Sequence, residues 1–246
     1  MDSWYEKWFN SPEYISVYKH RNSAEAEKLV DLILAKINPP PVSKVIDLAC
    51  GYGRHSISFA ERGFDVTGID ISKTLIEIAK ADSFSKNLNI DFINQDLSTL
   101  EISNKYFIAL NLFTSFGYYK EDEKNFNIFS IANGQLINGG YFVFDFLNSG
   151  YVRSNLESNS TEIFNDIKIE QHREIADDVV HKTIILTKGS VIKKYDEYVK
   201  LYNPEILSTE IVKRGFKIIG LYGDYNGSSF NIEESQRFLI ICQKAF

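Results

Sequence analysis

Hydrophobic and polar positions follow two rhythms along the chain. Between residues 44 and 146, short apolar runs of strand length alternate with segments whose apolar positions have helical spacing. We expect strands near 44–48, 65–70, 90–94, 106–111 and 140–146, and helices near 54–62, 72–84 and 122–137. This alternation is typical of an α/β fold with a parallel sheet, strands joined by crossover helices, and helices on both faces.

The rhythm changes after residue 146. The segments Ile163 to His172, Val179 to Thr187 and Val191 to Tyr202 are rich in β-formers, and turn residues separate them. They predict a three-stranded antiparallel meander. A helix from Asn203 or Pro204 to Arg214 and two strands, Phe216 to Tyr222 and Gln236 to Gln243, return the chain to the main sheet.

The N-terminal segment is aromatic. A first helix begins at Ser11-Pro12-Glu13, and a second begins at Asn22 or Ser23 and ends before Pro39-Pro40-Pro41. An insertion after the fifth strand lies on the rim where doubly wound sheets bind ligands, so the meander and the N-terminal helices are expected to roof a pocket. A plain sheet edge or a dimer surface is the alternative. The aromatic residues of the segment are Trp4, Tyr5, Trp8, Phe9, Tyr14 and Tyr18.

Composition agrees with a single soluble enzyme. The chain has 246 residues, 44% of them hydrophobic, and we find no apolar run of the roughly 18 residues that a membrane span needs. The N-terminus does not resemble a signal peptide, so we expect a cytoplasmic protein. The net charge of −6 and the scattered lysines and arginines disfavour extended nucleic-acid binding. Two cysteines, Cys50 and Cys242, give neither a disulfide framework nor metal-ligand spacing, and we expect no metal.

The most specific motif is a glycine-rich turn after the first strand. It runs Val45-Ile46-Asp47-Leu48-Ala49-Cys50-Gly51-Tyr52-Gly53-Arg54-His55-Ser56. Its glycines let the backbone turn sharply and approach a ligand closely. Seventeen residues after Gly53, the second strand ends at Asp70, the spacing at which nucleotide-binding βαβ units place an acid on ribose hydroxyls.

Two features of this turn disfavour a dinucleotide. Ser56 stands where the dinucleotide fingerprint has its third glycine, and Asp47 lies where a pyrophosphate would sit, so two negative charges would meet. A ligand with a ribose and a cation suits Asp47 and Asp70 better. S-adenosylmethionine has a ribose, an ammonium, a sulfonium and no phosphate.

In these residues the chain resembles the class I S-adenosylmethionine-dependent methyltransferases. The shared landmarks are the glycine turn, Asp70, Asp96 after the third strand, the segment Asn111 to Tyr118 after the fourth and the segment Gly139 to Asp145 in the fifth. The resemblance implies a Rossmann-like, mostly parallel seven-stranded sheet with an antiparallel final strand. We therefore expect an N-terminal helical lid over residues 1–40, a cofactor-binding domain over 41–149 and 203–246, and a β insertion over 150–202.

The resemblance also implies a set of cofactor contacts. Asp70 would accept hydrogen bonds from the ribose hydroxyls, Asp47 would face the methionine ammonium, and Asp96 would lie beside the adenine amino group. An N-terminal Tyr…His-Arg element would close over the cofactor carboxylate with Tyr18 and Arg21. The further contacts expected along the turn and the strand ends are Ala49, Cys50, Gly51, Gly53, Ile71, Gln95, Leu97, Asn111 and Leu112.

The implied chemistry is in-line methyl transfer, which depends mostly on proximity, alignment and a deprotonated acceptor. Tyr118 and Tyr202 are the leading catalytic candidates, and the others on the acceptor side are Tyr119, Asp145, His55 and Tyr198. We interpret His55 chiefly as a structural residue at a helix N-terminus. A small-molecule acceptor is our first hypothesis. An RNA or protein acceptor, a non-catalytic cofactor-binding regulator and, more weakly, a nicotinamide oxidoreductase are the alternatives.

Overall fold

A mixed seven-stranded sheet forms the centre of the computed structural model, which describes residues 4–18, 23–103 and 105–245. The strand order is β10-β11-β5-β4-β1-β2-β3, and only β11 runs antiparallel to its neighbours. This is the Rossmann-like sheet that the sequence predicts. The bounds of its strands are β1 Lys44–Leu48, β2 Asp65–Asp70, β3 Asp91–Asn94, β4 Tyr106–Asn111, β5 Leu136–Leu147, β10 Phe216–Tyr222 and β11 Arg237–Lys244.

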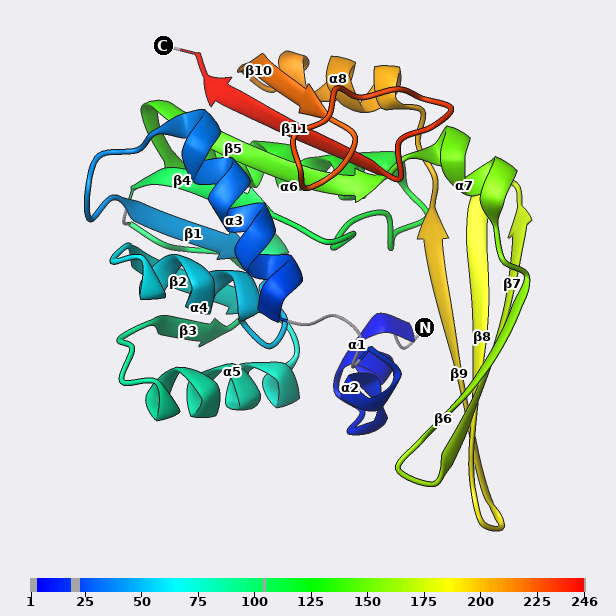
Figure 1. Cartoon of the computed structure of the whole chain (residues 1–246). Coiled ribbons are helices and arrows are strands. Elements are labelled where there is room, and N and C mark those ends of the chain that lie inside the picture. Colours follow the sequence, from blue (N-terminus) through cyan, green and yellow to red (C-terminus); the bar gives the residue numbers. More distant parts are fainter. Residues whose placement is uncertain (1–3, 19–22, 104, 246) are drawn as a thin grey trace.

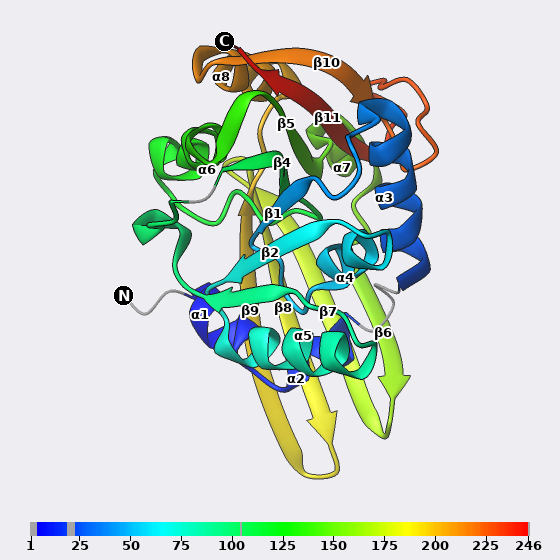
Figure 2. The same cartoon turned by 90° about the vertical axis from the view of Figure 1, so that its left-hand side faces the viewer.

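Helices cover both faces of this sheet (Figure 2). On one face, α3 (Ser23–Ile37) and α4 (Arg54–Glu61) bury an apolar cluster that includes Leu29, Ile33 and Phe59. On the other face, α6 (Asp122–Gln135) and α8 (Pro204–Lys213) pack on a core rich in phenylalanine. The helix α5 (Lys73–Ser85) packs against β2 and β3. The main strands are apolar on both sides, as parallel strands between two helical layers must be.

The insertion contains a short helix and four strands, not the three strands that the sequence predicts. Its elements are α7 (Ser149–Asn155), β6 (Asn159–Phe164), β7 (Ile167–Ala176), β8 (Val179–Lys188) and β9 (Val191–Lys200), paired antiparallel in that order. The predicted segment Ile163 to His172 is broken at Asn165-Asp166, whose φ values of 46° and 62° are those of a tight hairpin turn. The sequence pattern predicts one strand through this pair, so the predicted number of strands in the insertion is one too few.

The N-terminal helices α1 (Trp4–Phe9) and α2 (Glu13–Val17) lie between the central sheet and the insertion (Figure 1). Trp8, Tyr14, Val17 and Tyr18 form one apolar cluster with residues of the insertion strands, among them Ile184. The buried carboxylate of Glu197 on β9 accepts hydrogen bonds from the Trp8 indole and the Tyr18 hydroxyl. The insertion therefore holds the N-terminal helices in place.

None of the helices in residues 4–18, 23–103 and 105–245 is both long enough and apolar enough to span a membrane. The carboxyl ends of the parallel strands point toward α1, α2 and the insertion (Figure 1). A doubly wound sheet binds its ligand at this edge.

Candidate functional site

A cavity of about 390 Å³ lies at this edge of the sheet. Its volume is in the usual range for small-molecule and cofactor sites. Residues after β1, β2, β3 and β4 line one part of it, α1 and α2 provide its roof, and α6 closes another side. The lining residues are Tyr5, Phe9, Tyr14, Ala49, Gly51, Asp70, Ile71, Leu75, Asp96, Leu97, Ser98, Ser115, Phe116, Gly117, Tyr118, Tyr119, Lys124, Asn125, Asn127, Ile128 and Ile131.

The glycine turn connects β1 to α4 through left-handed backbone. Ala49, Gly51 and Gly53 have φ values of 64°, 57° and 81°. A Cβ on Gly53 would lie 2.7 Å from the Phe92 ring, so this glycine allows α4 to pack closely on the sheet. A Cβ on Gly51 would meet no atom of the described residues within 4 Å. Gly51 thus leaves open space for a ligand, whereas Gly53 serves packing.

Asp70 ends β2 with its carboxylate fixed by the backbone. One oxygen accepts the Gly51 N–H at 2.8 Å, and the other accepts the Ser72 N–H at 2.8 Å. Burial raises the pKa of Asp70 to about 6, although both backbone hydrogen bonds act against the rise. An acidic group that lines a cavity at the end of β2 fits the predicted contact with ribose hydroxyls.

Asp47 is buried within the turn and is absent from the cavity lining. Its carboxylate accepts the Ser56 hydroxyl at 2.7 Å. Burial raises its pKa to about 6, and the charge of Asp70 adds to the rise. In this structure Asp47 therefore fixes Ser56 at the start of α4 and lies outside the cavity lining, although the sequence predicts that it faces the methionine ammonium.

The segment after β3 places Asp96 and Leu97 on the cavity. The Asp96 carboxylate also accepts the Ser98 N–H at 2.8 Å and caps the short helix η1 (Leu97–Thr99). Gln95, a predicted contact, turns its amide to the Thr99 carbonyl at 2.7 Å and does not line the cavity.

The remaining predicted cofactor residues divide between the cavity and the packing behind it. Ala49 and Ile71 line the cavity. Cys50 and Leu112 are buried outside the lining, and burial raises the pKa of the Cys50 thiol well above its usual value. The Asn111 amide donates to the Leu48 carbonyl at 2.9 Å and joins β4 to the glycine turn.

Asp145, an acceptor-side candidate, is fully buried and forms an ion pair with Arg237, whose side chain is 15% exposed. Arg237 of β11 binds both of its carboxylate oxygens, at 2.9 and 3.0 Å, and Tyr225 donates to it at 2.8 Å. The carboxylate also accepts the Phe113 N–H at 2.9 Å. Every one of these contacts is structural, so Asp145 positions the loop after β4 and does not face an acceptor.

The two catalytic candidates lie in different places. Tyr118 lines the cavity and donates its hydroxyl to the Thr114 carbonyl at 2.8 Å. Tyr202 lies outside the lining, where its hydroxyl donates to Asp122 at 2.6 Å and accepts from Asn125 at 2.8 Å. Burial raises the pKa of Tyr202 far above its ordinary value. The structure thus places Tyr118 at the site and makes Tyr202 part of the packing behind it.

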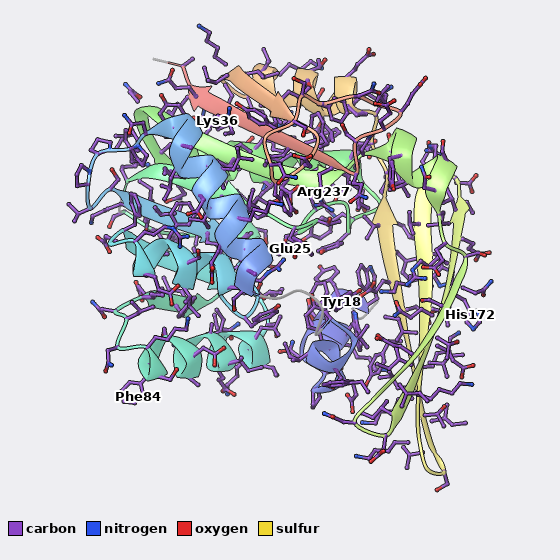
Figure 3. All side chains as sticks on the ribbon, in the orientation of Figure 1. Tyr18, Glu25, Lys36, Phe84, His172 and Arg237 are labelled. Atoms are coloured by element: carbon purple, nitrogen blue, oxygen red, sulfur yellow. The ribbon has the colours of Figure 1, made fainter. Side chains whose placement is uncertain are left out.

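The predicted N-terminal element and the histidine candidate are not part of the described lining. Tyr18 lies with the N-terminal helices (Figure 3), where it accepts from Lys182 at 2.9 Å and donates to Glu197. Arg21 is outside the described residues. His55 is buried at the start of α4, and burial holds its pKa well below the usual value, which agrees with a structural role.

Sequence reasoning missed part of the lining. Ser115, Phe116 and Gly117 belong to a landmark segment but were not singled out, and Asn127, Ile128 and Ile131 recur at helical spacing on α6. That spacing could have identified the face of α6. Arg237 carries no local signal, because its partner Asp145 is 92 residues away in sequence.

Residues 45–133 match a family model described as a methyltransferase domain. The chain contains a methyltransferase domain of the S-adenosylmethionine-dependent kind over these residues. The match covers the glycine turn, Asp70, Asp96 and the loop after β4, which line the cavity below the roof formed by α1 and α2.

Similar proteins span almost the whole methyltransferase. A protein of Geobacillus sp. (strain WCH70) named "Putative methyltransferase GWCH70_2453" is 22% identical over 98% of this chain and 97% of its own. A solved S-adenosylmethionine-dependent methyltransferase from Clostridium acetobutylicum has a TM-score of 0.82 at 18% identity, covering 95% of this chain and 96% of that one. The S-adenosylmethionine-bound structure of CalS10, an amino pentose methyltransferase from Micromonospora echinaspora, has a TM-score of 0.71 at 14% identity, covering 96% and 98%. The structural likenesses show the fold.

The cavity of the methyltransferase fits its cofactor, S-adenosylmethionine. Gly51 leaves free space beside a carboxylate, and Ile71 and Leu97 supply apolar surface on the same cavity. The Oδ1 atom of Asn111 is buried with no hydrogen-bond partner among the described residues, so it is an acceptor beside the glycine turn. The carboxylate and the apolar walls of the cavity match a cationic nucleoside, and the Asn111 amide oxygen is a further acceptor that lies outside the lining.

The two glycines of the turn give a matched pair of variants. Gly51→Ala should cost about 1 kcal/mol of stability, since its φ is left-handed, but should weaken cofactor binding at least about 10-fold because its methyl group enters the cavity. Gly53→Ala should lose more stability through the collision with Phe92. Urea unfolding and calorimetry on both variants check this. Wild-type cofactor affinity in Gly51→Ala would show that the ligand does not approach the turn.

Proposed function

We propose that the enzyme transfers a methyl group to a small-molecule acceptor bound in the same cavity as the cofactor. The observation that carries this proposal is the form of the cavity. It continues from the cofactor side, at Ala49 and Asp70, to Tyr118 and the roof residues Tyr5 and Phe9. A roofed pocket lined by aromatic and aliphatic side chains with a few polar groups is typical of small-molecule sites.

Each part of the chain then has a role. The carboxylate of Asp70 holds the ribose hydroxyls, Asp96 lies beside the adenine, and the loop from Ser115 to Tyr119 forms the floor of the acceptor side. The cofactor supplies an activated methyl group when bound. The chain contributes proximity, alignment and exclusion of water, which are large terms in displacement reactions. CalS10, named as an amino pentose methyltransferase, is a small-molecule enzyme of similar fold, which supports the proposal.

A two-stage experiment tests this function. Calorimetry should show one-to-one binding of S-adenosylmethionine and S-adenosylhomocysteine and no binding of NADH. Label from methyl-labelled cofactor should then appear in the low-molecular-weight fraction of a cell extract, and not in its RNA or protein. Label in RNA or protein would overturn the small-molecule acceptor. Failure of the folded protein to bind the cofactor would overturn the whole proposal.

A further inference from the structure

The acceptor side of the cavity has a wall of aromatic rings. The Tyr118 ring lies 5.3 Å from Trp4, 6.2 Å from Tyr5 and 5.6 Å from Phe9, measured between ring centroids. Tyr5 also lies 5.7 Å from Tyr119. The planes of these pairs meet at angles between 24° and 85°, so the rings are inclined to one another and do not form one flat stack. Tyr5, Phe9, Tyr118 and Tyr119 all line the cavity.

The charge around this wall is mainly negative. Asp70 and Asp96 line the same cavity, and each carboxylate is fixed by backbone N–H groups. The pKa of Tyr119 is raised by burial, by its hydrogen bond with Tyr5 and by the negative charges of Asp96 and Glu6. Lys124 brings a positive charge to the rim, but its ammonium lies 3.3 Å from Glu121. A cation is therefore favoured beside the rings.

We propose that the acceptor is an amine, and that the rings of Tyr5, Phe9 and Tyr118 bind its nitrogen as a cation. This inference rests on the proposed function and names the substrate class of that same site. Ring faces attract ammonium groups, and the attraction is larger where water is excluded. The carboxylates of Asp70 and Asp96 add a favourable field of longer range.

The chemistry of amine methylation agrees with this arrangement. The bound ammonium first releases one proton to water, which frees the nitrogen lone pair. That lone pair forms a bond to the methyl carbon, while the bond from that carbon to sulfur breaks and its electron pair stays on sulfur. The positive charge moves to the nitrogen, and a primary or secondary amine product then releases one proton to water. A wall that stabilises cations favours this transition state, because the charge develops beside the rings.

Binding of an isosteric pair tests the inference without knowledge of the acceptor. Choline and 3,3-dimethyl-1-butanol have nearly the same shape, but only choline is charged. In the S-adenosylhomocysteine complex, choline should bind at least about five-fold more tightly, as expected of a partly desolvated cation–π contact. Tyr118→Leu should reduce that preference to about two-fold or less, whereas Tyr118→Phe should keep it because the ring remains. Phe84→Leu is the control, since Phe84 is 84% exposed at the far end of α5 (Figure 3).

The outcomes separate this inference from the proposed function. If the folded wild-type chain does not bind the cofactor, the proposed function is overturned. Normal cofactor binding with equal affinity for choline and its neutral isostere would overturn the amine inference alone. Should Tyr118→Leu not fold, Tyr5→Leu on the helical roof tests the same wall. A choline preference unchanged in a folded leucine variant would also overturn the inference.

Discussion

Asp70→Asn should bind S-adenosylmethionine at least about 10-fold more weakly than the wild-type chain. A hydrogen bond to a charged acceptor contributes about 1.5–3 kcal/mol, and about 1.4 kcal/mol corresponds to a factor of ten. The asparagine keeps the size of the side chain but removes the charge that lies between the Gly51 and Ser72 amides. Calorimetry with the cofactor measures the loss, and thermal unfolding confirms that the variant is folded.

Asp65→Asn is the matched control for this variant. Asp65 lies at the amino-terminal end of β2, away from the cavity, where its side chain is 62% exposed and a carboxylate oxygen lies 3.7 Å from the Lys44 ammonium. Its removal should leave cofactor affinity unchanged. Equal affinity in Asp70→Asn and Asp65→Asn would refute the ribose contact.

The pH dependence of the wild-type chain gives a second test of Asp70. Its pKa of about 6 means that the carboxylate is lost as the pH falls through 6, so cofactor affinity should rise between pH 5 and pH 7.5. Stability should change in the opposite direction. A folded-state pKa above the ordinary value stabilises the fold at low pH, and this stabilisation is lost as the pH rises through about 6. Asp47 acts in the same direction, so Asp70→Asn should reduce the stability slope without abolishing it.

The sequence predicted the parts of the fold whose signals are local. Strand and helix positions followed from apolar spacing, and the glycine turn and Asp70 followed from a motif whose steric reason is visible in the contact between Gly53 and Phe92. The four-stranded insertion was missed because Asn165-Asp166 is a two-residue turn inside a β-rich run. One short turn changes the number of strands but hardly alters the composition of the segment.

The candidate site was less predictable because folding decides which side of a residue faces the cavity. The sequence predicts both Tyr118 and Tyr202 as acceptor-side residues, yet only Tyr118 lines the cavity. Hydrogen bonds with Asp122 and Asn125 hold Tyr202 behind it. Asp145 lies near the carboxyl end of β5, where a catalytic acid could lie, but it forms an ion pair with Arg237. Such pairings join residues that are far apart in the chain, and no local sequence pattern predicts them.

Arg237→Met should lower the free energy of unfolding by about 3 kcal/mol or more. The substitution leaves the Asp145 carboxylate buried without its charge partner, and Asp145 is 0% exposed. The same change releases the loop after β4, where Phe113 and Thr114 have left-handed φ values of 58° and 69°. Arg237 donates to the Thr114 hydroxyl at 3.0 Å, and Tyr118 donates to the Thr114 carbonyl. The loop that carries Tyr118 therefore depends on an ion pair outside the cavity. Urea unfolding of Arg237→Met measures the loss in free energy of unfolding.

Arg62→Met is the control, because the partner of Arg62 is Asp31, which is 64% exposed, and this ion pair should contribute about 1 kcal/mol or less. The change also removes hydrogen bonds from Arg62 to Ser58, but it leaves no buried charge without a partner.

A positioning role for Arg237 also predicts a split in kinetics once an acceptor is known. At a temperature where Arg237→Met is fully folded, kcat should fall while the cofactor KM stays near the wild-type value, since Asp70 and the glycine turn are untouched. Arg237→Lys should restore part of both stability and kcat by returning one charge-assisted hydrogen bond. A variant that loses stability but keeps kcat would limit the ion pair to folding, because the loop would then hold Tyr118 without it.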